Sequence, residues 1–317
     1  MFDYERLSGT NWVCVIDNIY PVLKKEIQGT DGFLRQTKRS NEDHRKSEIS
    51  SKIAEFRQTN DLSTLDFKIN QLANQFMDIN NKYSSILYYD HINILQTACF
   101  TKSKPILDSI SRFLSATSNT VASDRLKALV SRVVNESLSQ ANKSNAGEAG
   151  ENLTRAILTA AELVKDTHYR EQYKSKEGSD TDFAFPFVEN GEDYKVELFL
   201  AVQLSSNDRA RLTSSELKVG AKPFVFTGNG LDASKKRMKD IGAQIIEDLK
   251  SNRVNLVCYG PELQAEKARL NNAILKAKSK TEKQKEARQI LVDRLEYFER
   301  YTMSISEFAQ HLKKRFA

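Results

Sequence analysis

Two aspartates and a glutamine, at the ends of two expected strands, are the residues whose types and spacing suit chemistry. Asp180 and Asp182 begin an apolar alternating run, and a second alternating run, "YKVELFLAVQL", reaches Gln203 one residue before its end. The dipeptide Asn190-Gly191 between the runs is a strong hairpin signal, so the runs are expected to pair. Carboxylates gathered at strand ends suit the binding of a metal ion through their oxygens.

The elements that must position these residues form an α/β (α+β) region after about residue 148. Apolar residues alternate in the expected strands and recur every three or four positions in the expected helices. The expected elements are a helix over 148–167, strands over 168–175, 181–187 and 194–204, a helix over 207–220, a strand over 223–228, a helix over 233–251 and a strand over 254–260. This order predicts a mixed central sheet flanked by helices on both faces.

Three regions are expected along the chain. Residues 1–140 show helical periodicity and few Gly or Pro, and we expect a large all-helical domain for dimerisation, for embracing DNA, or for both. Residues 139–151, "SQANKSNAGEAGE", are small and polar and predict a linker into the α/β core of 141–262. Residues 263–317 predict basic helices packed on that core. The segment from Gln264 to Arg288 contains eight Lys or Arg and three Glu, which favours either a solvated helix face or a ridge that contacts phosphates.

Composition limits the class of protein. The 317 residues are 39% hydrophobic and 28% charged, which is typical of soluble globular chains. The sequence shows neither a signal peptide nor a membrane-spanning run, and its three cysteines are far apart, which favours a reducing cytoplasm over a disulfide framework. The net charge of +6 is compatible with a polyanionic partner without requiring one.

The element order and the residues at the strand ends resemble the PD-(D/E)xK nuclease superfamily, which includes most type II restriction endonucleases. In that family an aspartate starts the second core strand, and an acid-x-Lys tripeptide lies on the third. The resemblance covers about residues 148–260. It implies a Mg²⁺-dependent, site-specific deoxyribonuclease that acts on double-stranded DNA as a homodimer, in a bacterial or archaeal cytoplasm.

Carried over residue by residue, the resemblance makes Asp182 the family aspartate, with Asp180 as the alternative metal ligand. Gln203 stands in the lysine position, where it would position water, and Ala201 stands where the second acid is expected. Two explanations remain open. Glu216, thirteen positions after Gln203, would replace the acid, as in one restriction-enzyme branch. Alternatively, an original Glu at 201 was replaced to give an inactive protein, which we favour because position 201 otherwise completes the tripeptide.

Further residues around this core suit metal or DNA binding. Glu148 and Glu151 head the helix before the sheet, where some members of the family place an additional acid near the metal; complementing the helix dipole explains them equally well. Serine, amide and guanidinium groups after the third strand suit contacts to phosphates and base edges, and cations in the first turns of the expected 233–251 helix suit a phosphate. The expected DNA-binding residues are Ser205, Ser206, Asn207, Arg209, Arg211, Lys235, Lys236 and Arg237.

Two other functions remain compatible with the sequence. If Ala201 is native, the chain is a non-catalytic DNA-binding protein with a degenerate nuclease fold. Alternatively, it is a repair or recombination nuclease without sequence specificity. Neither hydrolase triads nor zinc sites are indicated, because His168 and His311 have no plausible partner in the sequence.

Overall fold

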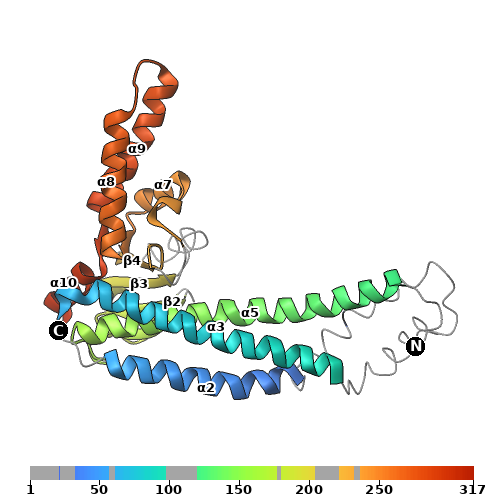
Figure 1. The fold of residues 1–317 in the computed structure, drawn as a ribbon. Helices are drawn as coiled ribbons and strands as arrows, with labels where there is room; N and C mark the ends of the chain where they lie inside the picture. Colours follow the sequence, from blue (N-terminus) through green and yellow to red (C-terminus); the bar gives the residue numbers. More distant parts are fainter. Residues whose placement is uncertain are drawn as a thin grey trace. The chain divides into compact units, whose positions relative to one another are not determined.

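The chain folds into two units, and the computed structural model describes residues 21, 33–56, 61–97, 120–176, 180–203, 221–231 and 236–317 (Figure 1). The helical unit comprises the described residues of 1–49 and 78–145, and the α/β unit comprises those of 50–77 and 146–317. These units divide the chain differently from the three expected regions, because residues 50–77 belong with the α/β unit.

Three long helices carry the N-terminal half: α2 (Phe33–Phe56), α3 (Leu65–Thr97) and α5 (Thr120–Ala160). The expectation of helices in this half is confirmed for the residues that are described. The predicted linker over 139–151 is wrong, because these residues lie within α5. The alanines, glutamates and glutamine of the segment are good helix formers, and they outweigh the two glycines.

A six-stranded sheet forms the centre of the α/β unit, with the strands side by side in chain order. β1 and β2 are antiparallel, as are β2 and β3, whereas β3 to β6 are parallel to one another. The strands are β1 (Arg170–Lys174), β2 (Asp180–Phe185), β3 (Leu198–Gln203), β4 (Lys222–Thr227), β5 (Asn255–Cys258) and β6 (Thr302–Ser304). The predicted mixed sheet is confirmed. The sequence pattern missed β6, which has only three residues.

The connection between β2 and β3 is longer than the tight hairpin that Asn190-Gly191 predicted. Pro186 follows the last residue of β2, and twelve residues that include η3 (Asp193–Lys195) precede β3. Gly191 adopts a φ of 82°, and the Asn190 side chain accepts a hydrogen bond from the backbone N–H of Lys174. The dipeptide therefore forms a turn that is held against β1.

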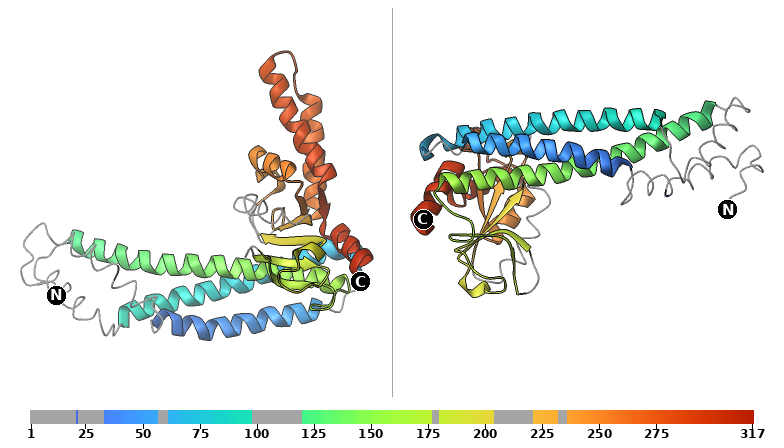
Figure 2. Two further views of the ribbon diagram at one scale, coloured as in Figure 1. Left: turned by 180° about the vertical axis from the view of Figure 1, so that it is seen from behind. Right: turned by 90° about the horizontal axis from the view of Figure 1, so that it is seen from below.

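Helices cover both faces of the sheet. On one face, aromatic residues of β2 and β4 pack against α10 (Ile305–Phe316), with Phe224 and Phe308 ring centroids 5.3 Å apart. The other face carries Ala201, Val225 and Leu256, which share one hydrophobic cluster with residues of α7 (Ala243–Ser251), α8 (Gly260–Lys276) and α9 (Glu282–Arg300). Figure 2 shows α7, α8 and α9 on the same side of the sheet.

Asp66, at the start of α3, ties the N-termini of α8 and α10 together within the α/β unit. Its carboxylate accepts backbone hydrogen bonds from Gly260 (2.6 Å), Ser306 (3.0 Å) and Ile305 (3.3 Å). The first N–H groups of a helix have no partner inside the helix, and they attract a carboxylate. This contact explains why residues 50–77 belong to the α/β unit.

The prediction of one continuous helix over 233–251 is wrong in its first half. Met238–Asp240 form the 3-10 turn η6, and α7 starts only at Ala243. The buried guanidinium of Arg294, on α9, donates hydrogen bonds to the backbone carbonyls of Met238 and Ile241. Because these carbonyls bond to Arg294, the backbone turns here instead of continuing as one helix.

Candidate functional site

Asp182 lies beside the third strand, as the sequence predicts. Phe183 pairs with Leu200 in the antiparallel register of β2 and β3, and one residue further along this register Asp182 lies opposite Ala201. The Asp182 carboxylate accepts a hydrogen bond of 2.7 Å from the backbone N–H of Val202. Asp182 is partly exposed, so its carboxylate both continues the β2–β3 pairing and remains accessible from outside the core.

Ala201 is buried, with 2% of its surface exposed. It belongs to the same hydrophobic cluster as Val225 on β4, Met238 and Ile241. Successive residues of a strand point to opposite faces, so Ala201 and Gln203 share the face that carries Asp182. The position where the sequence pattern expects a second acid therefore lies at the boundary between the strand ends and an apolar core.

Gln203 is the last residue of β3 and is partly exposed. It is paired in register with Thr227 at the end of β4, and its backbone carbonyl accepts a hydrogen bond of 3.1 Å from Gly228. The buried Asn229 then bonds to Thr227 and to the carbonyl of Arg237. Ligands of open α/β sheets bind outside the carboxyl ends of parallel strands, which is where Gln203 lies.

One of the two expected helix acids, Glu151, belongs to an ion-pair network. Glu151 forms a 3.0 Å ion pair with Arg155, which also binds Glu171 on β1 at 2.9 Å. Burial raises the pKa of Glu171, but hydrogen bonds from Arg155 and Lys165 outweigh burial and hold this pKa below its ordinary value of 4.5. The pairing of Arg155 with Glu171 was not predicted, because no signal in one sequence reveals a contact across sixteen residues. Glu148 lies in α5, one turn before this network.

Most of the expected DNA-binding residues lie outside the described residues. These are Ser205, Ser206, Asn207, Arg209, Arg211 and Lys235, together with the alternative acid Glu216. The backbone of Asp180 is placed at the start of β2, paired in register with Lys174, but its side chain is not described.

Lys236 and Arg237 do not occupy the first turn of an α-helix, contrary to the expectation. They precede η6, and the Arg237 backbone N–H donates to Asp240 at 2.8 Å. The Arg237 side chain is half exposed and lies 3.7 Å from Glu262. These two cations therefore do not lie at a helix N-terminus, where the helix dipole would help them to bind a phosphate.

The described residues offer few side chains that could bind Mg²⁺. Among the described residues, no group of three or more His, Cys, Asp or Glu side chains is placed to hold a metal ion. Mg²⁺ keeps several waters and is commonly held by one or two protein carboxylates. Asp182 suits one of these ligands, and Glu216, which lies outside the described residues, is the second acid that the sequence offers.

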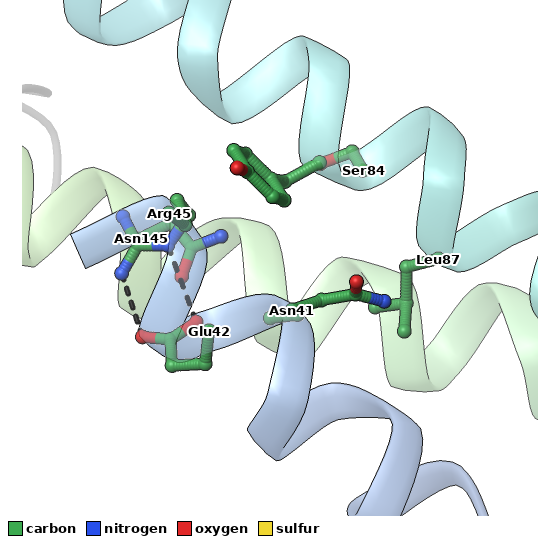
Figure 3. Close-up of a pocket in the computed structure, with 8 residues that line it drawn as sticks. Asn41, Glu42, Arg45, Ser84, Leu87 and Asn145 are labelled. Carbon is green, nitrogen blue, oxygen red and sulfur yellow. Dashed lines mark hydrogen bonds and ion pairs between the residues drawn. The ribbon is translucent and has the colours of Figure 1, made fainter. Parts of the chain in front are cut away.

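The helical unit offers a small cavity between α2, α3 and α5 (Figure 3). Its volume is ≈ 20 Å³, enough for about one water molecule. Arg45, on its wall, is 1% exposed and is bound by Glu42 at 2.6 Å and by Asn80 at 3.0 Å. Because these partners already satisfy Arg45, the cavity is a packing feature of the helices rather than a ligand site.

None of the described helices has both the length and the apolar character required to cross a membrane. No family model, curated protein or solved structure matches the chain.

Proposed function

We propose that the protein is a Mg²⁺-dependent endonuclease that hydrolyses phosphodiester bonds in double-stranded DNA, similar to type II restriction enzymes. The observation that carries the proposal is the position of Asp182. The sheet register places this aspartate opposite Ala201, and its carboxylate binds the backbone of Val202. Gln203 ends the same strand where the parallel part of the sheet begins. Two antiparallel strands followed by parallel ones suit a core that resembles PD-(D/E)xK nucleases.

Each residue of the proposed site would have a separate role in hydrolysis. Asp182 would hold the metal together with a second carboxylate, supplied by Glu216 or, in an active form, by an acid at position 201. Bound Mg²⁺ would polarise the scissile phosphate and make water a better nucleophile. The Gln203 amide, partly exposed at the strand end, would donate a hydrogen bond that orients this water. A homodimer would bring one such site to each strand of a palindrome.

A second candidate function is DNA binding without cleavage, and the burial of Ala201 favours it. A glutamate at this position would bring a carboxylate among the apolar side chains of Met238 and Ile241. Such burial costs several kcal/mol unless a cation or a hydrogen-bond partner compensates it. Alanine fills the position without this cost, as expected for a native residue in a nuclease-like core that has lost its activity.

Plasmid cleavage with Mg²⁺ by four versions of the full chain tests both candidates. We expect discrete fragments from Ala201→Glu and no cleavage by the chain as given. Cleavage by the chain as given that is lost in Glu216→Ala would identify Glu216 as the second acid. Adding Asp182→Asn to the Ala201→Glu variant is the matched control and should abolish its cleavage, because an amide oxygen still accepts the Val202 N–H while metal binding is weakened. Smearing instead of bands would favour a nuclease without sequence specificity.

A thermal-shift measurement gives a readout that does not depend on cleavage. If position 201 borders a metal site, Ala201→Glu is destabilised in EDTA and regains stability in Mg²⁺, while the chain as given responds less. If Ala201→Glu is destabilised equally in both buffers and neither protein cleaves, the endonuclease proposal is rejected. Binding of duplex DNA by both proteins would then support the non-catalytic candidate.

A further inference from the structure

The distal part of the α8–α9 helical hairpin, residues 271–290, has no core of its own. We call this segment the distal hairpin; it extends from the sheet beyond α7 (Figure 1). None of its residues is buried. Leu275 is 83% exposed and Ile290 is 52% exposed. The buried residues of both helices lie closer to the sheet, so burial does not explain why the chain extends this far.

The distal hairpin concentrates the positive charge of the chain. It carries six cations against two glutamates, a net charge of +4, whereas the whole chain carries +6. Five of the cations are exposed and have no ion pair within the described part of the chain: Lys276, Lys278, Lys280, Lys283 and Arg288. Lys285 is the exception, since it binds Glu282 at 2.7 Å. Closely spaced like charges repel one another, and a polyanion relieves this repulsion.

The tip of the distal hairpin is ordered by a capping box. The Thr281 hydroxyl accepts the backbone N–H of Gln284 at 3.3 Å, and the Gln284 side chain accepts the backbone N–H groups of Thr281 and Lys280 at 3.3 and 3.1 Å. These bonds fix the start of α9 and the turn that carries Lys278 and Lys280. A preorganised tip loses less conformational entropy when it binds a partner.

We propose that the distal hairpin binds the phosphate backbone of duplex DNA. This inference rests on the proposed action on DNA and adds a contact surface formed by different residues from those at Asp182. All but one of the six cations are lysines, which bind phosphates as flexible point charges, whereas arginine forks suit guanine edges. The surface therefore adds affinity that is independent of base sequence, and it anchors the duplex without selecting the cleavage site.

The test compares two quadruple Lys→Gln variants of the full chain that change the net charge equally. The hairpin variant replaces Lys276, Lys278, Lys280 and Lys283. The control variant replaces four lysines that are exposed elsewhere, Lys143, Lys174, Lys222 and Lys314. Glutamine is a helix former similar to lysine, and the two replaced lysines that lie on strands, Lys174 and Lys222, are exposed, so both variants should keep the far-UV circular dichroism and thermal midpoint of the parent. Binding to a fluorescent DNA duplex is measured by anisotropy in EDTA, which prevents metal-dependent cleavage, over a range of salt concentrations.

The salt dependence decides the outcome. Each phosphate contact contributes about 0.9 to the magnitude of the slope of log affinity against log salt concentration. One contact therefore makes the affinity about eightfold higher at 0.1 M salt than it would be at 1 M salt. We expect the hairpin variant to lose about two units of slope and at least ~50-fold in affinity at 0.1 M salt, to the same extent on unrelated duplexes. The control variant should change much less.

Equal slopes for the parent and the hairpin variant would reject the hairpin inference while leaving the proposed endonuclease in place. Equal losses in both variants would also reject it, because the effect would then follow net charge alone. If the parent chain binds no duplex DNA at all, both the inference and the proposed function fail. A loss seen with an RNA duplex but not with DNA would overturn the choice of partner.

Discussion

Replacing Asp66 by alanine should destabilise the α/β unit. The Asp66 carboxylate is the shared acceptor for backbone N–H groups at the starts of α8 and α10. The residue is 7% exposed, so water replaces the lost acceptor poorly. Asp66 also lies in the first turn of α3, where its charge suits that helix dipole.

The magnitude follows from the number of N–H groups that lose their acceptor. Loss of an N-terminal capping acceptor costs about 1 kcal/mol per helix, and the buried Gly260 N–H left without a partner adds about 1 kcal/mol or more. The total is about 3 kcal/mol. The α/β unit has about 200 residues, which gives an unfolding entropy of about 0.4 kcal/mol/K and a fall in midpoint of about 7 °C.

Thermal unfolding followed by circular dichroism at matched protein concentration measures this change. Asp66→Asn keeps the oxygen that accepts from Gly260 and Ile305 but loses the charge and the Ser306 bond, so we expect a fall of about 3 °C. Asp78→Ala, an exposed position of the same helix, is the matched control and should change the midpoint little. The reasoning is refuted if Asp66→Ala unfolds within about 1 °C of the parent, or if Asn is worse than Ala.

Two further predictions concern other buried features. Burial, with a smaller contribution from two nearby cations, lowers the pKa of His311 below its ordinary 6.5. The folded protein favours the neutral His311 ring, so the free energy of unfolding is highest above pH 6.5 and decreases as the pH falls. The free energy of unfolding of His311→Phe should therefore change less between pH 7.5 and 5.5 than that of the parent. Equal pH dependences in the two proteins would contradict this. Gly230 has a φ of 89°, and an added Cβ would lie 2.7 Å from the Glu262 side chain. Gly230→Ala should therefore cost about 2 kcal/mol, whereas Gly147→Ala, in open helix, should stabilise by up to about 1 kcal/mol. Urea denaturation measures both, and a neutral Gly230→Ala would show that the strain was overstated.

Local patterns predicted the strands well but predicted less of how segments join. Alternating residues identified β1 and β2, because alternation follows from the pleat of a half-buried strand, whereas short apolar runs identified β4 and β5, which are buried along most of their length. The predicted linker over 139–151 became part of α5, since a small polar composition is compatible with a helix when both flanks are helical. The break between η6 and α7 depends on Arg294, which lies more than fifty residues further along the chain.

At the candidate site, too, local patterns predicted the strands but not the contacts with distant segments. The hairpin signal between Asp182 and Ala201 predicted that the strands carrying them pair, and the pairing of β2 with β3 confirms this; one residue beyond the paired residues, the register brings Asp182 opposite Ala201. The burial of Ala201 was not predictable, because it depends on Met238 and Ile241, which reach the sheet from a later segment. The pairing of Arg155 on α5 with Glu171 on β1 likewise required the structure.

By itself, the sequence determined the strand segments, the helical character of the N-terminal half and the cations of the distal hairpin. Each of these depends on the types of nearby residues, which act through backbone geometry and solvation over a few positions. Only the tertiary structure decided that Asp66 joins two distant helix starts, that position 201 faces an apolar cluster, and that the charged hairpin extends beyond its core. Those properties depend on contacts between residues far apart in the chain, and no local pattern specifies them.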